Sequence, residues 1–118
     1  MNQDELKKRT KLFALRILKL TAALPSLPET NAIRNQLTRS GTSVGANYRA
    51  VCRARSTAEF ISKLGIVIEE ADESCFWLEL IIEGNFLSEE KVSALLNEAN
   101  EITAIMTAAR KTAQDNSK

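Results

Sequence analysis

The sequence has no histidine, two cysteines, and only four phenylalanines, one tyrosine and one tryptophan among its 118 residues. Histidine is the usual general base and a common metal ligand, so its absence argues against catalysis and against the di-metal sites of helix bundles. Cys52 and Cys75 are far apart in the sequence and form neither a CxxC pair nor a zinc-binding spacing. We therefore expect two reduced cysteines, no metal, no cofactor and no enzymatic activity.

The sequence also lacks a long apolar run. Residues 1–20 alternate charged and apolar side chains at helical spacing, which predicts neither a signal peptide nor a membrane span. The composition, 44% apolar and 26% charged, is typical of a globular domain in water. We expect one domain over residues 1–118 and a cytoplasmic location.

What the sequence does contain is aliphatic residues at helical spacing, which predicts an all-α protein. Four helices are expected, over residues 3–24, 28–54, 57–83 and 88–113. Pro25 ends the first, Ser56 opens the third as part of a capping box, and Gly84 ends it. Short connections between long helices predict an antiparallel up-down-up-down four-helix bundle, with a frayed tail after residue 111.

The third segment is apolar on a second side. Four apolar residues point away from its inner stripe: Ile66, Trp77, Leu80 and Ile81. Because a helix of a four-helix bundle buries one stripe, a second stripe with the only tryptophan predicts an interface with another copy of the chain. In the alternative interpretation, Trp77 only covers an edge of the bundle.

The stretch "RSGTSVGANYRA" at residues 39–50 places small residues inside a predicted helix. Gly41 and Gly45 share one flank of its apolar stripe, and Ser43, Ala46 and Ala50 share the other. Small side chains allow helices to approach closely, which offsets the poor helix propensity of glycine. One flank is expected to serve the bundle and the other a neighbouring subunit, or both serve the bundle.

Charge is unevenly distributed although the net charge is only +1. Residues 1–56 hold eleven basic and three acidic side chains, whereas residues 57–87 hold one basic and seven acidic. Arg39, Arg49 and Arg53 fall within about 80° of arc on the second helix, opposite its core stripe. This cluster predicts a surface for a phosphate backbone. In the alternative interpretations it is a solvated face, or its arginines pair across a subunit boundary with acidic residues of the third helix: Glu69, Glu70, Glu73 or Glu79.

Three pieces in fixed order carry a family resemblance: "QLTRSGTSVGANYR", "ARSTAEFISKL" and "EEADESCFWLEL". With them, residues 33–81 closely resemble the four-helix-bundle family named for the 23S rRNA-intervening sequence proteins. Relatives commonly have Glu-Ala where this chain has Ala50-Val51, which leaves the local surface more basic here.

The resemblance implies small bacterial bundle proteins that assemble as homopentamers around a central channel. A similar bundle is the accessory variability determinant of diversity-generating retroelements, whose basic channel is linked to nucleic acid and to reverse transcriptase. Most members of the family have no established biochemical activity.

Two functions are compatible with these features. The first is a non-enzymatic oligomer that binds structured RNA through phosphate contacts from Arg39, Arg49 and Arg53. The second is a protein-interaction scaffold that docks a partner enzyme such as a reverse transcriptase, and the near-neutral pI of about 7.8 favours it slightly.

Overall fold

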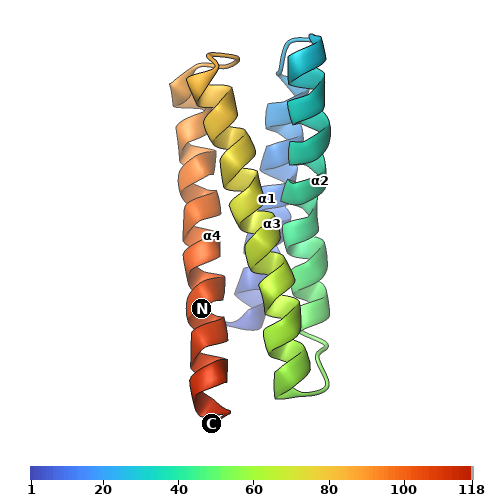
Figure 1. The fold of residues 1–118 in the computed structure, drawn as a ribbon, viewed down its shortest axis with the longest axis vertical. Helices are drawn as coiled ribbons and strands as arrows, with labels where there is room; N and C mark the ends of the chain where they lie inside the picture. Colours follow the sequence, from blue (N-terminus) through green and yellow to red (C-terminus); the bar gives the residue numbers. More distant parts are fainter. Residues whose placement is uncertain (118) are drawn as a thin grey trace.

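The computed structural model describes residues 1–117, and they form four α-helices that run alternately up and down (Figure 1). The helices are α1 (Gln3–Ala22), α2 (Pro28–Val51), α3 (Thr57–Glu83) and α4 (Glu89–Asn116). The chain measures 48 × 22 × 19 Å, so the bundle is long and narrow. The predicted all-α four-helix architecture is confirmed for the described residues. No helix among them is long and apolar enough to cross a membrane.

The helix ends follow the local signals closely, but three of them differ from the prediction, the first being α1, which ends at Ala22 rather than at residue 24. The Ser56 hydroxyl accepts the backbone N–H of Glu59 at 3.0 Å, as predicted for the start of α3. However, α2 ends at Val51, three residues early, because the N–H groups of Arg53 and Ala54 bond three residues back in a tight turn. The predicted fraying of the tail is wrong, since α4 continues to Asn116.

The core is built from aliphatic side chains of all four helices. Its largest fully buried members include Phe13, Ile17, Leu37, Leu64, Leu78, Ile81, Ile102 and Met106. The presence of Ile81 corrects the sequence analysis, which placed this residue outside the core. Ile81 lies two turns after Ser74, on the side of α3 that packs against α2, so the buried arc of α3 is wider than one stripe.

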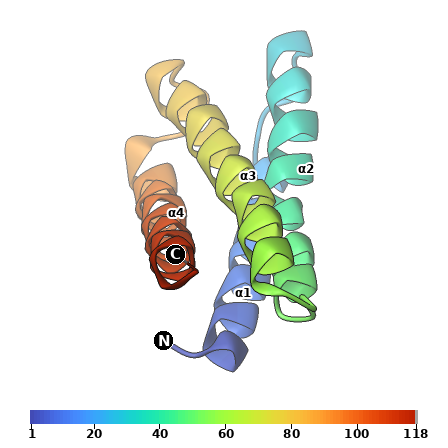
Figure 2. The same ribbon diagram turned by 60° about the horizontal axis from the view of Figure 1, so that its bottom comes forward.

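The helices form a ring of neighbours: among the described residues, the backbone of α1 lies close to those of α2 and α4, and α3 lies diagonally across the core from it. The pairs α1–α2, α2–α3 and α3–α4 make the more extensive contacts, whereas α1 and α4 touch over less of their surface. Figure 2 shows that the start of α2 and the end of α3 separate from each other. The outer faces of α1 and α3 therefore lie on opposite sides of the molecule.

Two glycines explain the small residues in α2. A Cβ on Gly41 would lie 2.7 Å from Cγ1 of Ile17, and one on Gly45 would lie 3.2 Å from the carbonyl oxygen of Thr10. Both glycines thus let α2 approach the backbone and side chains of α1. The flank that carries the glycines therefore packs within the bundle, as both alternatives allow, and the role of the other flank in a subunit interface stays a prediction.

Candidate nucleic-acid interface

A basic groove of about 650 Å³ lies between the N-terminal half of α1 and the C-terminal half of α2. Its lining includes five cationic side chains, Lys7, Lys8, Lys11, Arg49 and Arg53, and one carboxylate, Asp4. We call this surface the basic groove. Among the described residues, none of these five cations is held in an ion pair.

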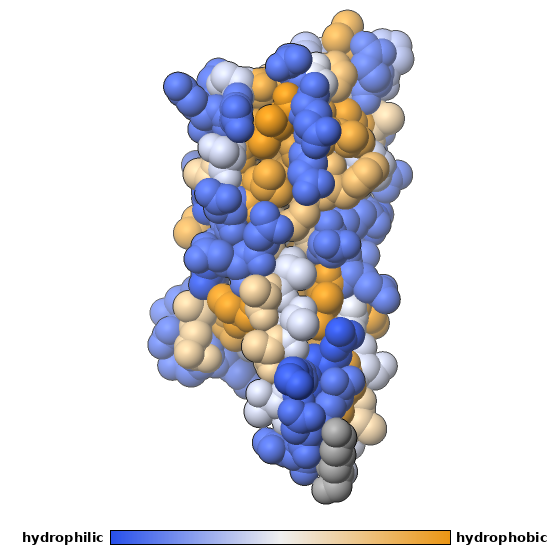
Figure 3. All heavy atoms as spheres, turned by 60° about the vertical axis from the view of Figure 1, so that its left-hand side comes forward, coloured by the Kyte–Doolittle hydropathy of each residue, from blue (hydrophilic) through white to orange (hydrophobic). Residues whose placement is uncertain are grey.

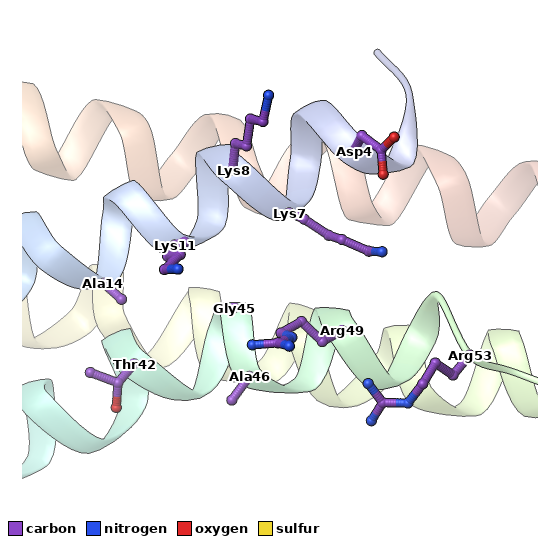
Figure 4. Close-up of a pocket in the computed structure, with 10 residues that line it drawn as sticks. All are labelled: Asp4, Lys7, Lys8, Lys11, Ala14, Thr42, Gly45, Ala46, Arg49 and Arg53. Carbon is purple, nitrogen blue, oxygen red and sulfur yellow. The ribbon is translucent and has the colours of Figure 1, made fainter.

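The side chains differ in how they face this space (Figure 4). Lys7 and Lys11 extend from α1 toward α2, Arg49 lies between the two helices, and Lys8 extends away from α2. Arg53 follows the end of α2 and lies farther along the groove. The cations therefore line the groove from two antiparallel helices rather than from one stripe of α2.

The floor of the groove is made of small side chains: Ala14, Thr42, Gly45 and Ala46. The close approach of Gly45 to α1 sets the distance between the two rows of cations, because no side chain separates the helices there. Small residues below and cations on both walls leave room for a chain of phosphates. Ala46, which the sequence predicts for a subunit interface, is exposed and lies on this floor.

Arg39 does not belong to the basic groove. Its guanidinium forms ion pairs with Glu70, at 2.9 Å, and with Glu73, both on α3 of the same chain. The three predicted arginines therefore lie on two sides of α2. Arg49 and Arg53 line the groove beside α1, and Arg39 faces α3. The pairing of Arg39 with acidic residues of the third helix was anticipated, but it occurs within one chain rather than across a subunit boundary.

The other residues predicted for an interface have mixed environments. Ile66 is exposed, and Trp77 and Leu80 are half-buried. The Trp77 indole N–H donates to Oε2 of Glu73 at 3.2 Å, and its ring meets Phe76 edge to face. Ser43 and Ala50 are half-buried on α2.

Three lysines of the groove were not among the predicted nucleic-acid-binding residues: Lys7, Lys8 and Lys11. The signal was present, since these residues follow the i, i+1, i+4 pattern of one helix face and six of the first 28 residues are basic. The partnership of α1 with α2 could not be deduced from the face of a single helix.

A second, smaller groove of about 290 Å³ lies between the end of α1 and the start of α4. Arg16, Lys19 and Lys91 surround a floor that includes Leu20, Leu87 and Leu95. Figure 3 shows the α4 side of the molecule, where apolar surface gathers in the upper part between hydrophilic side chains. An apolar floor suits a phosphate backbone less well than the small-residue floor of the basic groove.

A charged pair farther along α1 and α4 holds Arg9 outside the basic groove. The Arg9 guanidinium donates from Nε and Nη2 to the two carboxylate oxygens of Glu98, each at 2.7 Å. These hydrogen bonds lower the pKa of Glu98 and raise that of Arg9. Arg9 is therefore committed to the bundle rather than to a ligand.

Comparisons with known proteins agree with the motif evidence. The family model described as 23S rRNA-intervening sequence protein matches residues 2–108. The chain is also similar to a crystal structure of a protein of unknown function from the S23 ribosomal protein family of Bacteroides thetaiotaomicron VPI-5482, with 35% identity and a TM-score of 0.84. That match covers 94% of this chain and 99% of the other. No curated protein matches the chain.

Proposed function

The chain belongs to the 23S rRNA-intervening sequence protein family, and on this premise we propose that its basic groove binds RNA, without catalysis, in a cytoplasmic homo-oligomer. The observation that carries the proposal is the gathering of five cations around a groove floored by small residues, and none of the five forms an ion pair with a described residue. The family name associates its members with 23S rRNA genes, which favours RNA among polyanionic ligands.

The groove fits a phosphate backbone better than a base edge. Its walls offer ammonium and guanidinium groups, which contact phosphates without reading sequence. Its floor has no large aromatic side chain on which a base could stack. We therefore expect binding that weakens strongly with salt and depends little on base sequence.

Self-association is part of the proposal. Ile66 and Phe76 are exposed apolar residues on α3. Burying such side chains against another protein surface removes apolar area from water and favours association. The family resemblance implies five subunits arranged as a ring. Repetition of the basic groove around a ring would present several cationic sites to one RNA.

The test measures binding of a fluorescently labelled RNA stem-loop to a charge-reversal variant and to a matched control. The double variant Lys7→Glu, Arg49→Glu changes two cations of the groove. The control, Lys63→Glu with Lys111→Glu, changes two cations of the α3–α4 hairpin and lowers the net charge equally. We expect the groove variant to bind at least about tenfold more weakly and the control to change less than about threefold.

Equal losses in the two variants would mean that only the overall charge matters, and the groove would not be the binding site. Undetectable binding by the wild-type protein at low salt would overturn the proposal. In that case the scaffold function would take its place, and capture of the same protein partner after nuclease treatment would identify it.

A further inference from the structure

The outer face of α1 carries three large aliphatic side chains at the surface. Leu12, Leu15 and Leu18 are 56%, 51% and 43% exposed, and their spacing of three residues places them on one side of the helix. Exposed lysines lie beside them: Lys19, together with Lys8 and Lys11, which also line one edge of the basic groove. We call these six residues the α1 outer face, and no other helix of the described chain covers its leucines.

The outer face of α3 has the same mixture with the opposite charge. Ile66 and Phe76 are 44% and 52% exposed. Three exposed carboxylates surround them: Glu69, Asp72 and Glu79. We call these five residues the α3 outer face.

The two faces lie on opposite sides of one chain, since α1 and α3 occupy a diagonal of the bundle, with α1 behind α3 in the view of Figure 1. One chain therefore cannot cover its own exposed leucines with its own α3. Two copies can do so, with one copy turned so that its α1 outer face meets the α3 outer face of the other.

We infer that the α1 outer face of one copy docks onto the α3 outer face of the next, in a head-to-tail contact. Lysines would meet carboxylates and leucines would meet Ile66 and Phe76, so charge and apolar surface are complementary together. A pairing of two α1 faces or of two α3 faces would bring like charges together. The inference rests on the proposed self-association and adds which surfaces carry it.

A head-to-tail contact has a geometric consequence. Each copy uses one face and keeps the other face free for the next copy, so the contact repeats until a ring closes or a filament grows. An anionic lipid surface could cover the α1 outer face, but it would repel the acidic α3 outer face. One contact between two copies accounts for both faces.

The experiment uses two full-length variants that each disable one face. The first, Leu12→Glu with Leu15→Glu, makes the α1 outer face acidic. The second, Ile66→Ser with Phe76→Ser, removes the apolar part of the α3 outer face. Light scattering coupled to size exclusion gives the mass of each protein alone and of an equimolar mixture, and circular dichroism checks that each remains helical.

We expect a wild-type mass of several chains, monomers for each variant alone, and a mass of two chains for the mixture. The mixture stops at two because the first variant has only its α3 face and the second only its α1 face. Glu69→Lys with Glu79→Lys, which keeps every apolar residue, must also lower the wild-type mass. This charge variant provides the test of the α3 face if the serine variant unfolds.

A monomeric wild type, a variant that keeps the wild-type mass, or a mixture that stays monomeric would each overturn the inference. RNA binding is measured separately on the Ile66→Ser, Phe76→Ser variant, whose changes lie outside the basic groove. RNA binding with a monomeric mixture would reject the interface alone, whereas a two-chain mixture without RNA binding would reject the proposed function alone.

Discussion

Arg9 of α1 and Glu98 of α4 form a two-point ion pair, with both carboxylate oxygens 2.7 Å from guanidinium nitrogens. The pair joins the two neighbouring helices that are in least contact with each other. Parallel hydrogen bonds of this kind are among the stronger polar contacts in proteins, and both side chains are mostly buried from solvent. The bundle therefore closes at α1 and α4 partly through charge rather than through apolar packing alone.

Removal of this pair should destabilise the protein more than removal of a surface pair. We expect Glu98→Ala to lower the free energy of unfolding by about 1–3 kcal/mol, because the Arg9 guanidinium loses both short hydrogen bonds to Glu98 and keeps only the longer contact with Glu101, at 3.3 Å. Lys63→Ala, which breaks the exposed i, i+4 pair with Glu59, should cost only about 0.3–0.5 kcal/mol. Urea unfolding of the three proteins measures both changes, and equal losses would contradict the prediction.

The same pair predicts a dependence of stability on pH. The hydrogen bonds from Arg9 lower the pKa of Glu98 in the folded protein, whereas in the unfolded chain it stays near the ordinary value of about 4.3. Its contribution is therefore complete above pH about 4.3 and is lost as the pH falls through the folded pKa. The stability difference between the wild type and Glu98→Gln should be present at neutral pH and shrink in acid. An Arg9→Gln background should abolish this dependence, and a difference that persists unchanged in strong acid would refute it.

Glycine substitutions test whether close approach of α1 and α2 explains the small residues. Gly41→Ala should destabilise the protein by about 1–3 kcal/mol despite the better helix propensity of alanine, because the new Cβ would lie 2.7 Å from Ile17. Gly65→Ala is the matched control, since the nearest atom to its Cβ, Nη1 of Arg110, is 3.7 Å away. It should stabilise the protein by about 0.5–1 kcal/mol. Thermal unfolding separates the two, and stabilisation by both changes would show that α2 does not need the glycine at 41.

The helices could be predicted from the sequence because their causes are local. Apolar spacing, Pro25, Ser56 and Gly84 act within a few residues of the positions that they determine. Ile81 could not be placed, since its burial depends on how far α2 wraps around the side of α3. A helical wheel treats each helix alone and assigns one inner stripe, whereas α3 is covered from two sides.

The candidate site was predicted only in part for the same reason. Arg49 and Arg53 were identified, but their partners Lys7 and Lys11 lie on another helix, and the α1–α2 packing brings the four together. On a helical wheel Arg39 falls in the same arc of about 80° as the other two arginines, yet its neighbours are the carboxylates of α3. Which helix a charged residue faces is a tertiary property that one helix does not encode.

Arg49 lines the basic groove and Arg39 is paired with α3, so the two should differ in RNA binding. Each cation that contacts a phosphate adds about 0.7–0.9 to the slope of log affinity against log salt concentration, because binding releases condensed counterions. We expect Arg49→Ala to reduce this slope by about one such contact and to weaken binding at low salt. Arg39→Ala removes the same charge from the same helix, but its guanidinium is already occupied by Glu70 and Glu73, so the slope should not change. Fluorescence titrations of the labelled RNA stem-loop between about 50 and about 200 mM salt measure both slopes. A slope reduced equally by both substitutions would place Arg39 at the RNA and would contradict the assignment of the basic groove.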